Sequence, residues 1–280
     1  MSKLYIVPTP IGNLEDITLR AIRTLKEADF ILAEDTRTTA FLLKHLGIEK
    51  KLYSHHKFNE HATATTVAEA IGEGRTVALV SDAGTPGISD PGFLLVRTCV
   101  EAGIEVETLP GATAFVPALV QSGFPCDRFC FEGFLPQKKG RKQRIEALAH
   151  EERTMIFYEA PHKLLRTLSD MKEIFGGERK IALCRELTKR FETVIVTTLE
   201  QALERYKEEE PRGEYVLVVE GKSLDEFKKE QEADWQSKPI EEHMAYYESQ
   251  GVDHKEAMKR VAKDRGVSKR EIYKYLLEME

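Results

Sequence analysis

The stretch VALVSDAGTPGISDPG, residues 77–92, decides the fold of this chain. Its first four residues form an apolar run with the length of a buried β-strand. Residues 81–92 are rich in Gly, Pro, Ser and Asp, whereas an ordinary strand-to-helix connection needs only a few residues. This loop is longer than a simple connection between a strand and a helix needs to be. Its small residues would let a ligand approach the backbone.

Two further strand ends have the same character. The run YIV leads into PTPIGN at residues 8–13, and VETL leads into PGATA at residues 110–114. In open α/β sheets, ligands bind at the carboxyl ends of the strands, where the strand order reverses. Packing requirements would explain any one of these loops, but the three together favour a ligand site.

Short apolar runs alternate with amphipathic segments along most of the chain. The runs that predict strands span residues 3–7, 29–35, 76–80, 104–109, 128–134, 153–160, 180–187, 192–198 and 214–221. The segments with helical periodicity span residues 18–28, 39–47, 65–74, 92–103, 141–152, 162–176 and 198–209. This alternation predicts an α/β protein with largely parallel sheets.

We expect three regions: an α/β domain over residues 1–116, a second over 117–222, and a linker with a small helical domain over 223–280. Three short helices are expected after residue 239, and Asp253 with Glu256 and Ser268 with Glu271 fit capping boxes. The last two helices have helix-turn-helix spacing, although a helical hairpin that only packs explains them equally well.

Composition excludes several classes of protein. The 280 residues are 41% hydrophobic with a net charge of −6, and no apolar run approaches the roughly 20 residues of a membrane helix. The N-terminus does not resemble a secretory signal, and the four cysteines form no CxxC pair. We therefore expect a soluble cytoplasmic protein with reduced thiols that does not contact membranes.

Fingerprints of common ligands are missing. The sequence has no GxGxxG after a strand, no GxxxxGK[ST] and no nucleophile elbow, which disfavours dinucleotide, P-loop and hydrolase sites. The histidine-rich segment SHHKFNEH, residues 54–61, is expected in a loop and matches no zinc pattern, so no metal is expected.

Several long motifs occur in one order: YIVPTPIGNLEDITLRA, ILAEDTRTT, LVSDAGTPGISDPG, LPGATA, GFLP, YEAPHKL and RELTKRFET. With them, residues 1–222 resemble the small-subunit ribosomal RNA methyltransferase I branch of the tetrapyrrole methylase superfamily. The loop PTPIGN, residues 8–13, departs from the GxGPGD-like loop of the tetrapyrrole enzymes and has the form found in the RNA branch.

The resemblance implies a class III methyltransferase fold, with two α/β domains and S-adenosyl-L-methionine in the cleft between them. It implies a homodimer that methylates the ribose 2′-hydroxyl of a cytidine in the decoding region of 16S rRNA within the small ribosomal subunit. Two alternatives stay open: a methylase of a tetrapyrrole or other small acceptor, and a non-catalytic ribosome-associated factor that binds the cofactor.

The resemblance also implies the cofactor contacts. They fall on Pro10, Asp82, Ala83, Thr85, Thr113, Ala114, Tyr158, Leu187, Tyr215 and Val216. A sulfonium is a fixed cation, which favours backbone carbonyls and a nearby carboxylate, and the adenine needs an apolar slot. Asp82 is expected to be the most exposed polar contact.

Methyl transfer to a hydroxyl needs a group that takes its proton. Titratable residues in the motif-rich loops are few, and Glu60 and Lys189 are the preferred candidates for the base, with Asn59 and Glu186 as further catalytic candidates. The loop AEDTR offers Glu34, Asp35 and Arg37, for which a salt-bridged brace is as good an interpretation. Arg185 and His56 are expected to contact the RNA.

The segment PQKKGRKQR, residues 136–144, has five cations and no anion in an otherwise acidic protein. Cations on a glycine-containing loop suit neutralisation of RNA phosphates, which positions a substrate without reading its sequence. We predict that Lys138, Lys139, Arg141 and Lys142 contact RNA, against the alternative of a solvated loop before a helix.

Overall fold

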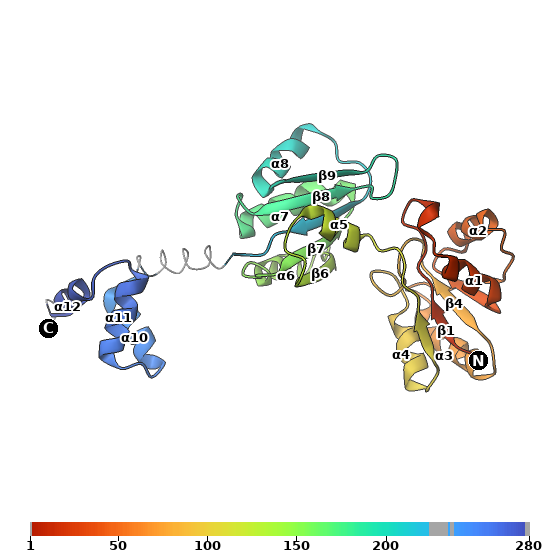
Figure 1. Cartoon of the computed structure of the whole chain (residues 1–280), viewed down its shortest axis with the longest axis horizontal. Coiled ribbons are helices and arrows are strands. Elements are labelled where there is room, and N and C mark those ends of the chain that lie inside the picture. The colour runs from red at the N-terminus through yellow and green to blue at the C-terminus, as the bar shows by residue number, and fades with distance from the viewer. Residues whose placement is uncertain (1, 224–234, 236–237, 278–280) are drawn as a thin grey trace. The chain divides into compact units, whose positions relative to one another are not determined.

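The computed structural model describes residues 2–223, 235 and 238–277. The chain forms two compact units (Figure 1). The α/β unit consists of Met1–Ala147 and Arg153–Glu220, and the helical unit of Leu148–Glu152 and Gly221–Glu280.

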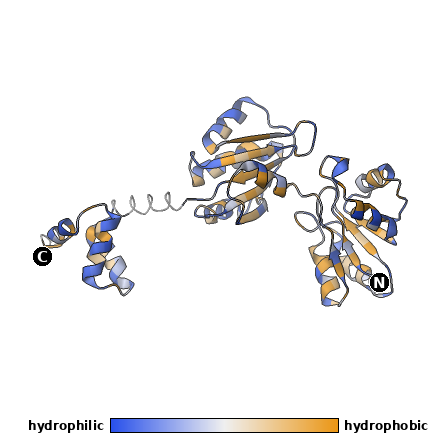
Figure 2. Cartoon of the chain, viewed as in Figure 1, coloured by the Kyte–Doolittle hydropathy of each residue, from blue (hydrophilic) through white to orange (hydrophobic). Residues whose placement is uncertain are grey.

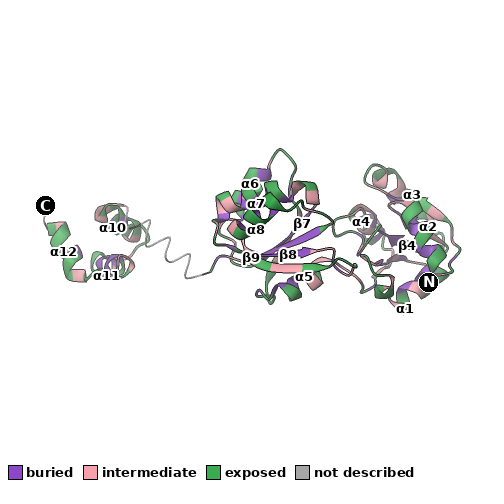
Figure 3. Cartoon of the chain, turned by 90° about the horizontal axis from the view of Figure 1, so that it is seen from above, coloured by how far each residue is buried: buried purple, intermediate pink, exposed green. Residues whose placement is uncertain are grey.

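Five parallel strands form the first sheet of the α/β unit in the order β3-β2-β4-β1-β5. They are β1 (Leu4–Ile6), β2 (Phe30–Ala33), β3 (Leu52–Ser54), β4 (Val77–Val80) and β5 (Val106–Thr108). All residues of the central strand β4 are buried, because helices cover both faces of the sheet (Figure 3). This explains the unbroken apolar run VALV.

The helices of the first sheet divide between its two faces. On one face, α1 (Leu19–Glu27) and α2 (Thr36–His45) pack against Ala78 and Val80; on the other, α3 (Glu60–Gly72) and α4 (Phe93–Glu101) pack against Val77 and Leu79. The alternating side chains of β4 thus join two cores. Figure 2 shows the hydrophobic strands and the amphipathic helices that cover them.

The second sheet has the order β6-β7-β10-β8-β9. Its strands are β6 (Phe129–Phe134), β7 (Thr154–Glu159), β8 (Lys180–Arg185), β9 (Thr193–Thr198) and β10 (Tyr215–Val219). Only β6 and β7 pair in parallel, and the other three pairs are antiparallel. The prediction of a largely parallel sheet is wrong here, because residues 186–192 join β8 to β9 directly and are too few for a crossover.

Helices α5 (Phe115–Ser122), α6 (Arg141–Ala147), α7 (Pro161–Phe175) and α8 (Leu199–Glu208) accompany this sheet. Helix α5 is absent from the predicted helices, because its residues span the expected domain boundary at residues 116–117. Pro117 lies in the first helical turn, where a missing N–H costs no hydrogen bond. Ala118 and Leu119 pack against Ile156 of the second sheet, so the boundary expected at residue 117 falls inside a helix of the second half.

The helical unit has its own core. Helices α10 (Ile240–Ser249), α11 (His254–Asp264) and α12 (Lys269–Leu277) enclose Met244, Val261 and Ile272. Both expected capping boxes have their N-cap bonds: Asp253 Oδ1 accepts from Glu256 N, and the side chains of Ser268 and Glu271 accept from each other's backbone N–H groups. Most of the expected linker, residues 224–234 and 236–237, lies outside the described residues.

Candidate functional site

A pocket of about 370 Å³ opens where strands of both sheets end, and we call it the central pocket. The first half of the α/β unit, up to residue 114, contributes residues that follow β1, β2, β4 and β5. The second half contributes the ends of β6, β7 and β8 and the start of β10. Its volume lies in the range of small-molecule sites.

Hydrogen bonds hold the three loops of the first half together. Thr9 and Gly84 exchange both of their backbone hydrogen bonds at 2.9 Å, and the Thr9 hydroxyl donates to Ser81 O at 3.1 Å. The Thr85 hydroxyl donates to Ala112 O at 3.0 Å. At Gly111, a Cβ atom would lie 2.6 Å from Pro8 Cβ, so only glycine permits this approach. The predicted convergence of the three loops is confirmed.

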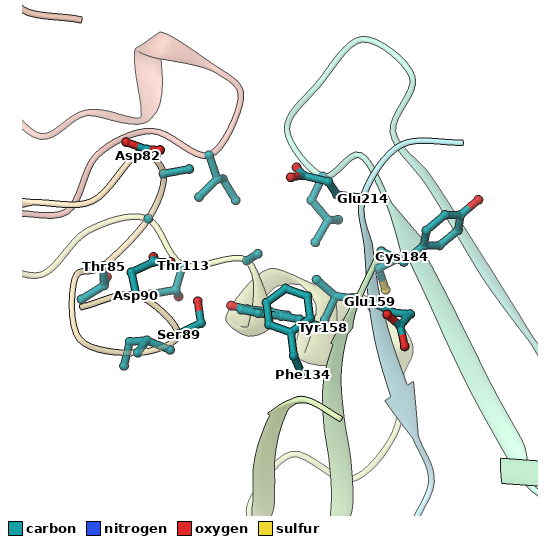
Figure 4. A pocket seen from close by; sticks show the side chains of 18 of the residues that line it. Asp82, Thr85, Ser89, Asp90, Thr113, Phe134, Tyr158, Glu159, Cys184 and Glu214 are labelled. Atoms are coloured by element: carbon teal, nitrogen blue, oxygen red, sulfur yellow. The ribbon is translucent and has the colours of Figure 1, made fainter. Parts of the chain in front are cut away.

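The elaborate loop after β4 forms one wall of the central pocket. Asp82, Ala83, Gly84, Thr85, Ile88, Ser89 and Asp90 all line it. Helix α4 begins only at Phe93, after the chain has passed along this wall. Figure 4 shows the loop curving past the labelled side chains of Asp82, Thr85, Ser89 and Asp90.

The opposite wall is more apolar. Phe134, Tyr158, Leu187 and Val216 line it, and the Tyr158 ring meets Phe134 edge-on with centroids 5.6 Å apart. Burial raises the pKa of Tyr158 to about 12, so its hydroxyl stays protonated. This hydroxyl points toward the side of the pocket that carries Ser89 and Asp90 (Figure 4).

The loop of residues 186–192 has an unusual backbone. Among the described residues, Glu186 (φ 51°) and Thr188 (φ 65°) are the only non-glycine residues with positive φ, and such a φ is rare for a β-branched residue. Glu186 N donates to Glu214 O, and Glu214 N donates to Glu186 Oε1, each at 2.9 Å. These bonds fasten the loop to the start of β10. Glu186 therefore holds this loop against β10. Burial opposes ionisation of its carboxyl group, but the hydrogen bond from Glu214 N and the nearby Lys189 lower its pKa.

Lys189 is not suited to act as a base. Its Nζ lies 2.7 Å from Glu214 Oε2 and 3.0 Å from Glu186 Oε1. Although burial opposes the charged form, these two carboxylates raise the pKa of Lys189, so the ammonium stays protonated. These contacts do not support the prediction that Lys189 takes the proton, although Lys189 does line the central pocket.

Acidic side chains dominate the charge of the central pocket. Six acidic residues line it, Glu34, Asp82, Asp90, Glu159, Glu186 and Glu214, against one cationic residue, Lys189. Burial, followed by the negative charges of Asp90 and Asp82, raises the pKa of Glu34 to about 7. Burial and Asp82 likewise raise the pKa of Asp90. The pocket therefore suits a ligand that carries positive charge.

Most of the expected cofactor contacts meet in this pocket. Asp82, Ala83, Thr85, Thr113, Ala114, Tyr158, Leu187, Tyr215 and Val216 line it. Pro10 does not, but its neighbour Ile11 does. The contacts themselves stay predictions.

The histidine-rich segment lies elsewhere. Asn59 and Glu60 do not line the central pocket, and Glu60 is the first residue of α3 rather than a loop residue. Asn59 Oδ1 accepts from His56 N at 2.8 Å, and its Nδ2 donates to Ser54 O at 3.0 Å. Asn59 thus shapes the loop after β3, and the geometry does not support a catalytic role for Asn59 or Glu60.

Arg141 differs from the other cations of its segment. Its side chain is buried, Nε donates to Asp170 Oδ2 and Nη2 donates to the Thr167 hydroxyl, both at 2.7 Å. The prediction that Arg141 contacts RNA is wrong, because Arg141 is the first residue of α6 and its side chain is buried inside the protein. Lys138, Lys139 and Lys142 are exposed. Arg185 does not line the central pocket either.

Glu34 and Asp90 line the pocket but are not among the predicted catalytic or cofactor-binding residues. The sequence allows a salt-bridged brace of Glu34, Asp35 and Arg37, but only the last two form one. Arg37 donates to Asp35 through two side-chain nitrogens, and Asp35 caps α2. Asp90 was not considered. Its position in the same loop as Asp82 was an available signal, but the approach of Glu34 to both aspartates depends on the pairing of β2 with β4.

The described residues contain neither a metal-binding cluster nor a membrane-spanning helix. No group of three or more His, Cys, Asp or Glu side chains there is arranged to hold a metal ion. None of the described helices combines the length and apolar character needed to cross a membrane.

Comparison with known proteins was made by sequence and by structure. The family model for tetrapyrrole (corrin/porphyrin) methylases matches residues 3–203. A ribosomal RNA small subunit methyltransferase I of Halalkalibacterium halodurans is 50% identical over 96% of this chain and 93% of its own length. The protein of the same name from Escherichia coli O157:H7 is 47% identical over 99% of this chain and 96% of its length.

Solved structures share the fold at lower identity. A uroporphyrin-III C-methyltransferase from Thermus thermophilus is 25% identical, with a TM-score of 0.57 over 79% of this chain and 94% of that chain. A diphthine synthase is 14% identical, with a TM-score of 0.61 over 79% of this chain and 90% of that chain. Another structure of the Thermus enzyme type, 21% identical with a TM-score of 0.56, is complexed with S-adenyl homocysteine and covers 78% of this chain and 97% of that chain.

Proposed function

Because the chain belongs to the ribosomal RNA small subunit methyltransferase I branch of the tetrapyrrole methylase family, we propose that it methylates 16S rRNA with S-adenosyl-L-methionine. The proposed product is 2′-O-methylcytidine in the decoding region of the small subunit. The observation that carries the proposal is the central pocket, which joins an acidic wall to an apolar one at the strand ends. Because the proposed substrate is the small ribosomal subunit, we propose that the protein acts in the cytoplasm. We also propose that two copies of the chain form a homodimer.

The residues of the pocket fit this cofactor. S-adenosyl-L-methionine, when bound, supplies a methyl group from a sulfonium that cannot lose its charge by deprotonation. The negative charges of Asp82 and Asp90 would attract such a cation, and Gly84, which has no side chain, also lines the pocket. Tyr158, Leu187 and Val216 offer the apolar surface that an adenine requires.

We assign removal of the 2′-hydroxyl proton to Glu34. It lines the pocket at the end of β2, and its carboxyl group forms no hydrogen bond among the described residues. A pKa of about 7 lets the carboxylate accept a proton near neutral pH more readily than an ordinary glutamate does. Asp82 and Asp90 act as positioning residues for this chemistry, because their negative charges add to burial in raising the pKa of Glu34.

The exposed lysines of residues 138–142 are proposed to hold RNA phosphates. Lys138 and Lys139 lie in the turn before α6, and Lys142 lies in its first turn with two ion pairs longer than 3.7 Å. Exposed pairs of this length contribute little, so Lys142 can exchange them for a phosphate.

The experiment that tests the function is transfer of a labelled methyl group from S-adenosyl-L-methionine to small ribosomal subunits that lack the modification. Nucleoside mass spectrometry should then find the label in 2′-O-methylcytidine. Label in a base, or in another nucleoside, would contradict the assignment. Label in uroporphyrinogen instead of RNA would support a small acceptor, and cofactor binding without any transfer would support a non-catalytic factor.

A further inference from the structure

The loop that follows β3, residues 55–59, carries an aromatic side chain that nothing in the α/β unit covers. Phe58 is 95% exposed, the largest exposed fraction of any large apolar side chain in the described part of the chain. Leaving a phenyl ring in water is unfavourable, so a ring held out in this way is suited to meet another molecule.

The loop is held in one shape. Its backbone bonds to the Asn59 side chain were described above, and Phe58 N donates to His56 Nδ1 at 3.3 Å. Asn59 N and Glu60 N both donate to His56 O, which joins the loop to the start of α3. The His56 ring lies edge-on to Phe58, with centroids 6.0 Å apart. A ring presented on such a loop loses little conformational entropy when it binds.

The loop lies next to the acidic end of the central pocket. His55 N donates to Ala33 O at 2.8 Å, and the residue after Ala33 is Glu34, which lines the pocket. β3 pairs with β2 in parallel, so residues that follow the two strands emerge at the same edge of the sheet. Phe58 is therefore close in the fold to the proposed site of proton transfer.

The surroundings of Phe58 favour RNA over a protein partner. Protein interfaces bury contiguous apolar patches, whereas the loop neighbours of this ring are His56, Lys57 and Asn59. A single aromatic ring beside an exposed lysine matches the way proteins hold unpaired nucleotides: the ring stacks on a base and the cation meets its phosphate.

We propose that Phe58 stacks on an unpaired base of the RNA substrate beside the nucleotide whose ribose enters the central pocket. Lys57 contacts the adjoining phosphate, and Asn59 is a positioning residue that fixes the loop. The inference rests on the proposed RNA methylation and adds a substrate-binding element outside the pocket.

The test measures methylation of unmodified small subunits by the full chain with Phe58→Ala, Phe58→Leu and Phe58→Trp. Loss of one stacked base should lower kcat/KM for subunits by roughly tenfold to a hundredfold in the Ala and Leu variants. The Trp variant should stay near the wild type, and the KM for S-adenosyl-L-methionine should not change in any of them. Phe41→Ala is the matched control, because Phe41 is 70% exposed but lies on α2.

The Leu variant separates stacking from simple apolar contact. If Phe58→Leu behaves as the wild type while Phe58→Ala does not, the ring serves an apolar contact, and a shift in sedimentation would identify it as a contact with a second copy. Unchanged kcat/KM in all three variants would overturn the inference while leaving the methyltransferase assignment intact. If the wild type neither methylated nor bound the subunits, both the stacking of Phe58 and the proposed RNA methylation would be overturned.

Discussion

At the scale of single residues, the acidic end of the central pocket determines how Glu34 ionises. Burial and the charges of Asp90 and Asp82 place its pKa near 7, whereas Lys189 is held protonated by two glutamates. The pKa of both groups is raised, but the Glu34 carboxylate can accept a proton near neutral pH whereas the Lys189 ammonium already carries one, which supports the proposed assignment of the base to Glu34.

Glu34→Gln should lower the rate of methyl transfer by about a hundredfold or more, because a positioned base contributes 10²–10⁴ to such reactions. Cofactor affinity, measured by calorimetry, should change far less. In the wild type the single-turnover rate should rise with pH and level off above pH of about 7, when Glu34 is ionised. Glu60→Gln is the control, and a larger loss there than in Glu34→Gln would refute the assignment.

The same ionisation predicts how stability depends on pH. The pKa of Glu34 in the folded chain, about 7, lies above its usual 4.5, so folding favours the protonated form. The stabilisation is complete below pH 4.5 and is lost as the pH rises through about 7. Thermal melts should therefore show Glu34→Gln gaining stability relative to the wild type at pH 8 but not at pH 4; equal differences at both would contradict the raised pKa.

Asp82 connects cofactor binding to this ionisation. Asp82→Asn keeps an acceptor for the backbone N–H of Asp35, now 3.0 Å away, but removes the charge. We expect calorimetry to show about tenfold weaker cofactor binding, and the pH midpoint of the rate to move down because Glu34 loses a negative neighbour. Asp82→Ala should bind the cofactor at least as weakly while the far-ultraviolet circular dichroism stays unchanged. Wild-type affinity in both variants would remove Asp82 from the site.

At the scale of elements, the loop PTPIGN and the loop of residues 186–192 shape the pocket by fitting closely together. A Cβ on Gly12 would lie 2.4 Å from Lys189 Cγ, and one on Gly213 would lie 2.5 Å from Glu186 Cγ. Glycine at these two positions allows the strained 186–192 loop to approach its neighbours.

Gly12→Ala should displace Lys189 and weaken cofactor binding by about tenfold, with a loss of stability of about 1–2 kcal/mol. Gly47→Ala provides the matched control: its φ of +64° is also unfavourable for alanine, but a Cβ there meets nothing within 4 Å. It should cost similar stability in thermal melts yet leave the cofactor Kd unchanged. Equal affinities of the two variants would show that the contact at Gly12 does not shape the pocket.

The basic segment divides into surface cations and one structural cation. Replacement of Lys138, Lys139 and Lys142 with Ala should weaken subunit binding and lower the slope of log K against log salt by about 2–3, with no change in melting temperature. Arg141→Ala should instead lower stability by about 1–3 kcal/mol, since it removes a buried side chain and its hydrogen bonds to Asp170 and Thr167. An unchanged salt slope in the triple variant would dismiss the phosphate contacts.

At the scale of the whole molecule, the chain is two units with separate cores. The central pocket belongs to the α/β unit, and the core around Met244, Val261 and Ile272 belongs to the helical unit. Binding at the pocket can therefore stabilise one unit without stabilising the other.

Calorimetry of the full chain should show two unfolding transitions. S-adenosyl-L-methionine at a hundred times its Kd should stabilise the transition of the α/β unit by about 2.7 kcal/mol and leave the other where it was. A single transition that shifts as a whole would mean that the two units unfold cooperatively.

The sequence alone was sufficient for local structure and for much of the site. Apolar runs and their periodicity located nine strands and most of the helices of the two sheets. The Gly- and Pro-rich loops after β1, β4 and β5 indicated the pocket. These features are encoded within a few neighbouring residues, so they can be recognised before any tertiary contact is known. The predictions lack the short strand β3, because three residues show no period, and helix α5, because its residues span the expected domain boundary.

Only the tertiary structure decided the strand directions of the second sheet, the burial of Arg141 and the ionisation of Glu34 and Lys189. Each depends on groups far apart in the sequence: β10 enters between β7 and β8, Arg141 meets Asp170, and Glu34 is affected by Asp82 and Asp90. Charge and burial act through space, so a residue type and its sequence neighbours leave them undetermined until the strands are paired.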